Sequence, residues 1–589
     1  MNRGILVLIF AVAAWAGPAA HGSKLSKDLA NADPQSYVRV IVQWNSAADD
    51  SKDQKVVNRG GAVHARLRST KGGVYTIPAA LLGELANDPE VVYITPDRTI
   101  NAKLDNSAAA VNASAAWSAG WNGTGIGVAV IDSGINPDPN LKGHWYTYDF
   151  TNKSAAATAA LLAASALAPL AANAPAPAPG GPAPDQYGHG QHVSGIIASS
   201  GQTSNCPNCT RTFKGIAPNA TLVDFRVLDQ NGQGVDSDVI LAIDAAIYLK
   251  NVYNIRVINL SLGRPVYESY TLDPLCQAVE AAWKAGIVVV AAAGNDGRDN
   301  TFGEQGYGTI NSPGNDPYVI TVGAMKTEGT YTRIDDLIAS YSSKGPTQVD
   351  HIVKPDLVAP GNLVVSLGFP GSTLYKQNPA NQVLPSYYQS GPPGKPGPGS
   401  PNFLTLSGTS MAAPVVSGAA ADLLQANPNL TPDQVKALLM QTAYKTFPPT
   451  STVIDPTSGL SYTDYYDIYT VGAGYLDLAA ALSSLNTPPV SGTAMSPVST
   501  YDSTTGIVTL AYDPSSIWAN QSVWGSQSVW GSQSVWGSSV LSGNRCVWGA
   551  QSIWGASSLS SSRSVWGAQS LWGASTPIAS ESIEITGEQ

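Results

Sequence analysis

The sequence predicts an α/β protein with a mostly parallel β-sheet flanked by helices. Five apolar runs rich in Val and Ile show little alternation of polar and apolar residues, as is typical of strands buried on both faces of a parallel sheet. Helical patterns such as 236–250 and 275–285 separate these runs. Strands that alternate with helices predict a sheet whose functional site lies at the carboxyl ends of its strands. The five runs are residues 126–131, 222–228, 257–262, 287–293 and 319–322.

The composition is that of a globular protein with a large core. The chain has 589 residues, of which 43% are hydrophobic and 13% are charged, and its formal net charge is −10. This apolar content excludes a disordered acidic protein. The negative charge argues against nucleic acid or an anionic membrane as the main partner.

The first 22 residues have the pattern of a secretory signal peptide. A positive charge at Arg3 is followed by an apolar run over 4–16 and by small residues up to Gly22. The run is too short to span a bilayer, and we find no other stretch of about 20 apolar residues, so we expect no transmembrane segment. The pattern therefore predicts a secreted protein, either extracellular or at the cell surface.

Residues 37–103 have the pattern of a small α+β unit. Residues 37–43 alternate like a strand, and 72–77 and 91–94 are two further strand candidates. Residues 78–86 between the last two are a helix candidate. The unit precedes the first apolar run of the predicted sheet, which indicates a separate domain.

Four polar residues suited to catalysis lie at the ends of apolar elements. Asp132 ends the first apolar run, Asn295 follows the fourth, and His189 opens the motif His-Gly-Gln-His-Val-Ser-Gly. Ser410 lies among small residues in 406–414, at the start of an apolar helix. A serine nucleophile needs a base, the base needs a carboxylate, and the tetrahedral intermediate needs a hydrogen-bond donor. The four residue types therefore form one catalytic set.

Each of these residues also has a structural interpretation. Ser410 could cap its helix, and Asp132 and Asn295 could be turn residues. His189 and His192 could bind a metal as a pair, but the zincin pattern also needs a glutamate that is absent between them. The joint presence of all four types favours the catalytic interpretation and predicts no metal in the site.

The order Asp132, His189, Ser410, in these local contexts, resembles the subtilisin-like serine proteases (subtilases) over roughly residues 37–485. The resemblance implies a serine endopeptidase in which Ser410 is the nucleophile, His189 is the general base and Asp132 orients the base. It also implies an oxyanion hole formed by the Asn295 side-chain amide and the Ser410 backbone N–H.

Three neighbouring positions complete this comparison. Thr409 matches the family residue beside the nucleophile, where its role is supportive. Gln191 stands where the family usually has Thr, and Ser194 stands where it usually has Ala. Neither departure affects a residue that carries the chemistry.

The resemblance also implies a substrate-binding surface. The residues that match the family strand pairing with the substrate backbone are Ser261, Leu262 and Gly263. The residues that match one wall of the primary specificity pocket are Ala292, Ala293 and Gly294. Backbone pairing tolerates many side chains, and small uncharged walls leave room for an apolar one, so we expect broad specificity with an apolar preference. No cofactor is required, and calcium is expected only as a structural ion that is common in the family.

By the same resemblance, the unit at 37–103 is an inhibitor-type propeptide. Such a propeptide assists folding, occupies the active site and is removed by self-cleavage, here between Thr99 and Asn112. The resulting division of the chain is a signal peptide at 1–22, the propeptide at 37–103, the catalytic domain at 104–486, a linker at 487–515, a repeat region at 516–575 and a tail at 576–589.

The chain contains four cysteines, Cys206, Cys209, Cys276 and Cys546. Cys206 and Cys209 could be a redox pair, half of a zinc site or a short structural disulfide. No second Cys/His pair has zinc-finger spacing, and an exported protein favours a structural disulfide. The sequence does not specify which cysteines pair.

The repeat region is an uninterrupted array of a six-residue unit, Ser-(Val/Ile/Leu)-Trp-Gly-(Ser/Ala)-x. Its tryptophans, eight of the 14 in the chain, are at positions 518, 524, 530, 536, 548, 554, 566 and 572. An even period places Ser and Trp on one face of a strand, which favours a β-solenoid-like stack or an added sheet. A disordered low-complexity tail is the alternative. An exposed Trp face would suit a carbohydrate, a cell wall or a partner chain.

Together these features predict a secreted serine endopeptidase that hydrolyses peptide bonds through an acyl-enzyme and is made as a self-processing zymogen. Its expected partners are protein or peptide substrates and its own propeptide. A second interpretation is a surface-binding or display protein whose main function is the Trp array.

Overall fold

The structure of the chain is a computed structural model, and it divides into two compact units, residues 1–101 and 102–589. Each unit is described by itself. The residues that the structure describes are 24–25, 29, 33–67, 71–96, 104–141, 145–151, 184–206, 208–299, 304–389, 402–455, 459–486, 492–502, 507–513, 515–517, 585 and 587–588. The signal-peptide prediction and almost all of the predicted repeat array lie outside these residues.

The first unit is a four-stranded antiparallel sheet with two helices. Its strands have the order β2-β3-β1-β4. The elements are β1 (Tyr37–Trp44), α1 (Asp50–Val57), β2 (Ala62–Leu67), β3 (Gly72–Pro78), α2 (Leu82–Ala86) and β4 (Val91–Pro96). Alternate residues of β1, from Val40 to Trp44, are buried, and with Tyr75 and Ile77 of β3 they form a core of its own. This unit is therefore a separately packed α+β body.

The sequence did not reveal two elements of this unit, α1 and β2. Helix α1 carries only one buried apolar residue, Val56, so it has almost no apolar periodicity. Its N-terminus is instead fixed by Asp49, whose carboxylate accepts a hydrogen bond from the Lys52 backbone at 3.1 Å. Strand β2 pairs only with β3 and lies at the edge of the sheet, where burial leaves a weaker pattern.

The second unit contains an eight-stranded, mostly parallel sheet. Its strand order is β13-β12-β9-β8-β5-β7-β6, and β14 also pairs with β12. Six of these pairings are parallel, and only that of β12 with β13 is antiparallel. The strands are β5 (Gly127–Asp132), β6 (Trp145–Asp149), β7 (Thr221–Arg226), β8 (Ile255–Leu260), β9 (Val288–Ala292), β12 (Ile320–Lys326), β13 (Leu337–Ile338) and β14 (Leu357–Pro360). The predicted α/β fold with a mostly parallel sheet is confirmed.

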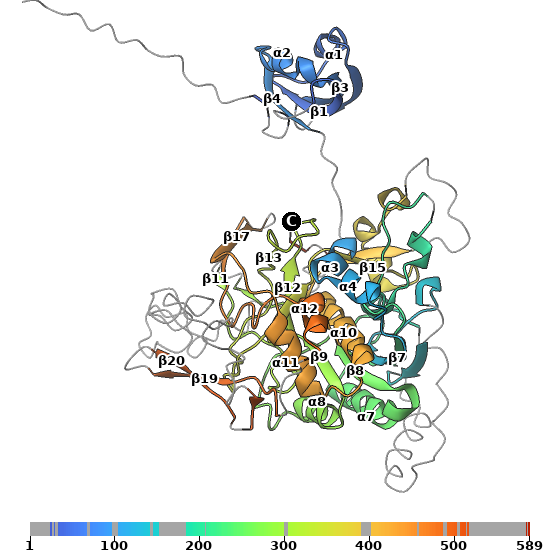
Figure 1. The fold of residues 1–589 in the computed structure, drawn as a ribbon, viewed down its shortest axis with the longest axis vertical. Coiled ribbons are helices and arrows are strands. Elements are labelled where there is room, and N and C mark those ends of the chain that lie inside the picture. The colour runs from blue at the N-terminus through green and yellow to red at the C-terminus, as the bar shows by residue number, and fades with distance from the viewer. Residues whose placement is uncertain are drawn as a thin grey trace, which may run out of the picture. The chain divides into compact units, whose positions relative to one another are not determined.

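Helices cover both faces of this sheet. Every residue of β5 and of β9 is buried, which requires cover on each face. Helix α10 packs on β8, β9 and β12 and against α6, whereas α7 and α8 pack together on β8 and β9. Figure 1 shows α10 and α11 lying across β8 and β9. The helices are α3 (Leu104–Ala110), α4 (Ala113–Ser118), α6 (His189–Ala198), α7 (Asp236–Tyr253), α8 (Pro274–Lys284), α9 (Thr373–Gln377), α10 (Thr409–Ala426), α11 (Pro432–Thr442) and α12 (Leu478–Ser483).

Four small two-stranded sheets surround the main sheet. They pair β10 (Arg298–Asp299) with β11 (Glu304–Gln305), β15 (Val364–Leu367) with β16 (Phe403–Leu406), β17 (Thr450–Ile454) with β18 (Ser461–Tyr465), and β19 (Val498–Asp502) with β20 (Ile507–Ala511). The sequence showed none of these pairs clearly, because strands this short carry too few residues for a periodic pattern to be recognised.

The expected linker at 487–515 is wrong for its described residues. The Ser499 amide donates to the His351 carbonyl oxygen at 2.8 Å, and the Val353 amide donates to the Pro497 carbonyl oxygen at 2.9 Å. The β19–β20 hairpin is therefore joined to the catalytic unit. The Thr-Pro-Pro sequence at 487–489 suggested a linker, but the backbone hydrogen bonds that hold the following segment cannot be inferred from the sequence.

No helix among the described residues is long and apolar enough to cross a membrane.

Cys206 and Cys209 form a disulfide, and Cys276 is a buried free thiol. Cys546 lies outside the described residues.

Candidate active site

Asp132 and His189 form a buried pair at the edge of the main sheet. Asp132 is the last residue of β5, and His189 is the first residue of α6. The Nδ1 atom of His189 lies 2.8 Å from Oδ1 and 3.0 Å from Oδ2 of Asp132. Because a carboxylate only accepts, this contact places the proton of the neutral imidazole on Nδ1 and leaves Nε2 as the basic nitrogen.

A second carboxylate, Asp185, fixes the start of helix α6. It accepts hydrogen bonds from the Gly188 amide at 2.6 Å, the Gln191 amide at 2.7 Å and the Ser133 hydroxyl at 2.8 Å. The Ser133 hydroxyl also accepts from the Gly190 amide at 2.8 Å. These bonds hold both flanks of His189, so Asp185 is a positioning residue that the sequence reasoning missed. Its place four residues before His189 was the only available signal.

Gly190 and Gln191 join helix α6 to the loop after Asp132. A Cβ on Gly190 would lie 2.4 Å from the Gly134 carbonyl oxygen, so only glycine allows this approach. The Gln191 side chain accepts a hydrogen bond from the Asn136 amide at 2.7 Å. Gln191, which departs from the usual family residue, therefore holds the loop that follows Asp132 in place.

His192 points away from this pair, into the core. It is fully buried, and its Nε2 donates to the carbonyl oxygens of Val364 at 3.1 Å and Leu404 at 3.0 Å. Burial lowers the pKa of His192 to about 3. Nε2 of His192 is therefore bound to main-chain oxygens of β15 and the β16 segment and takes no part in the contact between His189 and Asp132.

Ser410 is the second residue of helix α10 and is tied to the end of strand β8. Its hydroxyl donates to the Ser261 carbonyl oxygen at 3.1 Å, and the Ser261 hydroxyl donates to the Ser410 carbonyl oxygen at 2.8 Å. Asn259 of β8 donates in turn to the Ser261 hydroxyl at 3.0 Å. Two elements distant in sequence thus hold this serine at the carboxyl end of the sheet.

Asn295 lies beside Ser410 with its amide held in one orientation. Its Oδ1 accepts from the Thr409 amide at 2.9 Å and from the Thr409 hydroxyl at 3.1 Å. Gly294, with φ of +108°, makes the turn after β9 that delivers this side chain. Because Oδ1 is occupied, the donor end of the amide is the end available to a ligand.

Nearly all of the predicted site residues line one cavity of about 520 Å³. Those that do are His189, Ser261, Leu262, Gly263, Ala292, Gly294, Asn295, Thr409 and Ser410. Asp132 lies behind His189, and Ala293, whose amide donates to the Val322 carbonyl oxygen at 3.0 Å, does not line the cavity. The end of strand β8, the starts of helices α6 and α10 and the turn after β9 therefore bring together residues as far apart in the sequence as His189 and Ser410.

Comparison with known proteins places this site in a family. The model of the subtilase family, Peptidase_S8, matches residues 123–465. The chain belongs to the subtilase family. The matched stretch contains Asp132, His189, Asn295 and Ser410, whereas the first compact unit and the Trp array lie outside it.

Two bacterial relatives show how far the likeness extends. The serine protease AprX of Bacillus subtilis is 35% identical over 62% of this chain and 71% of its own length. Subtilisin E of the same species is 29% identical over 69% of this chain and 85% of its own. A solved cold-adapted subtilisin-like serine proteinase is 26% identical over 55% of this chain and 85% of that one, with a TM-score of 0.36. The protein is a subtilase-type serine endopeptidase.

The cavity of this subtilase continues past Ser410 along residues that the sequence reasoning did not anticipate. The loop from Gly232 to Val235 forms part of its wall, and Arg264 and Asp236 lie there too. The guanidinium of Arg264 contacts Asp236 and Asp273, each at 2.8 Å. Its charge is therefore compensated, and this wall of the subtilase cavity has no free cation to attract an acidic side chain.

No cluster of three or more His, Cys, Asp or Glu side chains with metal-binding geometry occurs in the described part of the subtilase. The carboxylates of the site are occupied by hydrogen-bond donors of the protein, as the contacts of Asp132 and Asp185 show.

Proposed function

We propose that this subtilase is a secreted endopeptidase that cleaves peptide bonds with Asp132, His189 and Ser410. The observation that carries the proposal is that His189, with its proton fixed on Nδ1 by Asp132, lines the same cavity as Ser410 and Asn295. Nucleophile, base and oxyanion donor thus line one cavity large enough for a peptide, and the orienting carboxylate lies behind the base.

In the proposed reaction, Nε2 of His189 takes the proton of the Ser410 hydroxyl as Oγ attacks the scissile carbonyl carbon. Asp132 keeps the imidazole oriented and stabilises its positive charge. The Asn295 amide and the Ser410 backbone N–H stabilise the oxyanion. His189 then protonates the leaving amine, and a water molecule, activated in the same way, hydrolyses the acyl-enzyme.

The proposed catalytic roles are tested by hydrolysis of a denatured protein substrate. We expect the mature protein to hydrolyse it and Ser410→Ala to be inert. Ser483→Ala, which alters an exposed serine of α12, is the matched control and should keep full activity. Equal activity of Ser410→Ala and the control would remove Ser410 from the mechanism.

For substrate selection, we propose backbone pairing along Ser261–Leu262–Gly263 and an apolar primary pocket beside Ala292 and Gly294. Backbone recognition carries little side-chain information, so specificity should be broad. Profiling with a peptide library should show apolar residues enriched before the cleaved bond. Strict cleavage after Arg or Lys would contradict this part of the proposal.

We propose that the first compact unit is an inhibitor-type propeptide that is removed by self-cleavage. In the catalytic unit, α3 and the residues after it are packed: Asn106, Ser107 and Val111 are almost fully buried. A cut inside this segment would remove part of the core, so we narrow the expected cleavage to the N-terminal side of Asn106. N-terminal sequencing of the secreted protein tests this, and a mature start near residue 23 would contradict it.

A further inference from the structure

Glu588, which follows the Trp array in the sequence, lies inside the catalytic unit. Only 4% of this residue is exposed. Its carboxylate oxygen Oε1 accepts hydrogen bonds from the Ser340 amide at 2.8 Å, from the Ser340 hydroxyl and from the Arg298 guanidinium at 2.6 Å. Lys326 lies 3.4 Å from the other carboxylate oxygen. A buried glutamate is tolerated only where such donors replace water, so this recess is built for a carboxylate.

The backbone on either side of Glu588 is bound as specifically as its side chain. The Asn362 side chain pairs with the main chain of Glu588 in both directions: its Oδ1 accepts from the Glu588 amide and its Nδ2 donates to the Glu588 carbonyl oxygen, each at 2.8 Å. Asn381 donates to the Ile585 carbonyl oxygen at 2.6 Å. Two asparagine side chains thus hold this segment as a neighbouring strand would.

The residue before Glu588 must be glycine. Gly587 has φ of +58°, and a Cβ there would lie 2.3 Å from the Ser407 hydroxyl and 2.7 Å from a Leu363 methyl group. Both the conformation and the space exclude other residues. The site therefore recognises a Gly-Glu pair.

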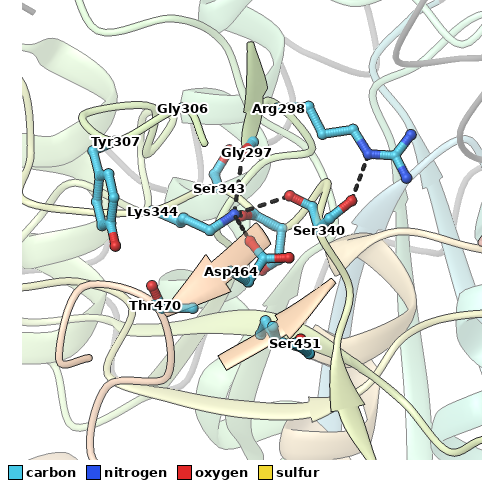
Figure 2. Close-up of polar contacts among 12 residues, drawn as sticks. Gly297, Arg298, Gly306, Tyr307, Ser340, Ser343, Lys344, Ser451, Asp464 and Thr470 are labelled. Carbon is cyan, nitrogen blue, oxygen red and sulfur yellow. Dashed lines mark hydrogen bonds and ion pairs between the residues drawn. The ribbon is translucent and has the colours of Figure 1, made fainter. Parts of the chain in front are cut away.

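Ser340, which donates to Glu588, also belongs to a polar network that Figure 2 shows around the Lys344 ammonium group. Lys344 is fully buried and donates to the Ser340 carbonyl oxygen at 2.9 Å and the Gly297 carbonyl oxygen at 3.1 Å, and it pairs with Asp464 at 3.1 Å. Arg298 donates to the Ser340 hydroxyl in the same view. The donors that meet Glu588 are thus held in place by the protein itself, and the site is preorganised.

The other flank of the array is fixed as well. Ile517, the residue before the first Trp of the array, is 4% exposed and packs in the main core. Its amide donates to the Thr493 carbonyl oxygen at 2.8 Å. The described residues before and after the array, Ile517 on one side and Ile585 and Glu588 on the other, are therefore all held by the catalytic unit.

We propose that Arg298, Ser340 and Asn362 form a docking site for a Gly-Glu peptide segment, and that its occupant is the protein's own Gly587–Glu588. Ile517 before the array and Glu588 after it are then both held by the catalytic unit. The same contacts should hold the segment when it is no longer covalently continuous with the catalytic unit. This proposal does not depend on the chemistry assigned to Ser410.

The test uses the full chain with Ser410→Ala, which prevents self-cleavage. A recognition sequence for an unrelated site-specific protease is inserted after Ser575, the folded protein is cut there, and dissociation of the fragment that begins at Thr576 is followed by size-exclusion chromatography and mass spectrometry. We expect the fragment to stay bound, Glu588→Gln to speed its release at least tenfold, and Gly587→Ala to do the same. Glu581→Gln, which removes the same charge from another glutamate of the fragment, is the matched control and should have no effect.

A competition experiment tests the same proposal without substituting Gly587 or Glu588 in the protein, so it applies even if those variants do not fold. Synthetic peptides Ile-Thr-Gly-Glu-Gln and Ile-Thr-Gly-Gln-Gln are added to the same cut protein with its native fragment. The Glu peptide should displace the fragment at a concentration at least tenfold lower than the Gln peptide. The proposal is overturned if the fragment leaves the unsubstituted protein as fast as it leaves Glu588→Gln, or if the two peptides compete equally.

Discussion

Thr409 holds the side-chain oxygen of Asn295 with two hydrogen bonds, one from its amide at 2.9 Å and one from its hydroxyl at 3.1 Å. The Thr409 hydroxyl also accepts from the Gly294 amide at 3.1 Å. One residue beside the nucleophile thus sets which end of the Asn295 amide faces the cavity, and it ties that amide to the turn after β9. Thr409 contacts no reacting atom, so its role is positioning.

The first prediction concerns this hydroxyl. Thr409→Val keeps the shape of the side chain but removes the bonds that its hydroxyl makes with Asn295 and Gly294. We expect kcat to fall about tenfold with KM nearly unchanged, because a disordered oxyanion donor weakens binding of the transition state more than of the substrate. Steady-state kinetics with a peptide substrate measure this, and Thr409→Ser, which keeps the hydroxyl, should restore most of kcat.

A double substitution separates positioning from a general loss of stability. Asn295→Ala alone should lower turnover by about a hundred- to a thousand-fold, the range found for a donor of this kind in subtilisin. If Thr409 acts through Asn295, Thr409→Val should cost almost nothing further in the Asn295→Ala background. Additive losses would mean that Thr409 has another role.

The second prediction is that Asp185→Asn impairs catalysis although Asp185 lies behind the cavity. Its two carboxylate oxygens accept from Gly188, Gln191 and Ser133, and an amide nitrogen in place of one oxygen would face a donor. We expect kcat to fall at least tenfold because His189 loses its fixed position. Asp138→Asn, which alters a carboxylate bonded only to nearby Asn140, is the control. Equal effects of the two substitutions would contradict a specific role for Asp185.

The third prediction concerns acid stability. The pKa of His192 is lowered to about 3 in the folded protein, below its ordinary value of 6.5, because burial disfavours the charged imidazole. Between these pH values the unfolded chain binds a proton at His192 that the folded chain does not. The contribution of His192 to the free energy of unfolding is therefore full above pH 6.5 and is lost as the pH falls towards 3. The measurement uses the Ser410→Ala variant, which cannot cleave itself. We expect protonation of His192 to lower its free energy of unfolding by up to about 1.4 kcal/mol for each pH unit of acidification.

His192→Gln tests that assignment, because glutamine keeps a donor for the Val364 and Leu404 carbonyl oxygens but does not titrate. The substitution should make the stability curve flatter between pH 6.5 and 4, even if it lowers stability overall. Denaturant unfolding at several pH values measures this, and an unchanged slope would assign the acid sensitivity to other groups.

The fourth prediction concerns the buried ion pair of Lys344 and Asp464, which are 0% and 2% exposed in their side chains. Lys344→Met leaves a buried carboxylate without its charge partner, so we expect a loss of about 3–5 kcal/mol in unfolding free energy. Lys344→Met with Asp464→Asn should lose less than the sum of the single variants. Lys284→Met breaks the exposed pair with Glu280 and should cost less than about 1 kcal/mol. A small loss for Lys344→Met would show that the pair contributes little to stability.

The sequence was sufficient to predict the α/β class and the residues around the cavity, because both depend on local signals. Buried parallel strands are continuous apolar runs; Asp132 lies at the end of such a run, and His189 and Ser410 lie at the starts of helices. These signals are local in the sequence, so they can be recognised without knowing any tertiary contact. Ala293, which follows the last residue of β9, does not line the cavity, and no local signal in the sequence distinguished it from Ala292 and Gly294.

Other features depend on contacts between distant segments and could not be read from the sequence. Asp185 matters because it meets Ser133, 52 positions earlier in the chain. The residues 498–502 looked like a linker until their pairing with His351 was known. Glu588 is one glutamate among many in the sequence, and only the fold brings Arg298 and Asn362 around it.

The most direct test of the account is covalent labelling of the mature protein with a fluorophosphonate probe, which reacts with activated serine hydroxyls. Wild-type protein should be labelled at Ser410, as located by peptide mass spectrometry, and both Ser410→Ala and His189→Ala should lose the label. Labelling at another serine, or a label retained in His189→Ala at the wild-type rate, would contradict the assignment of Ser410 as nucleophile and His189 as its base.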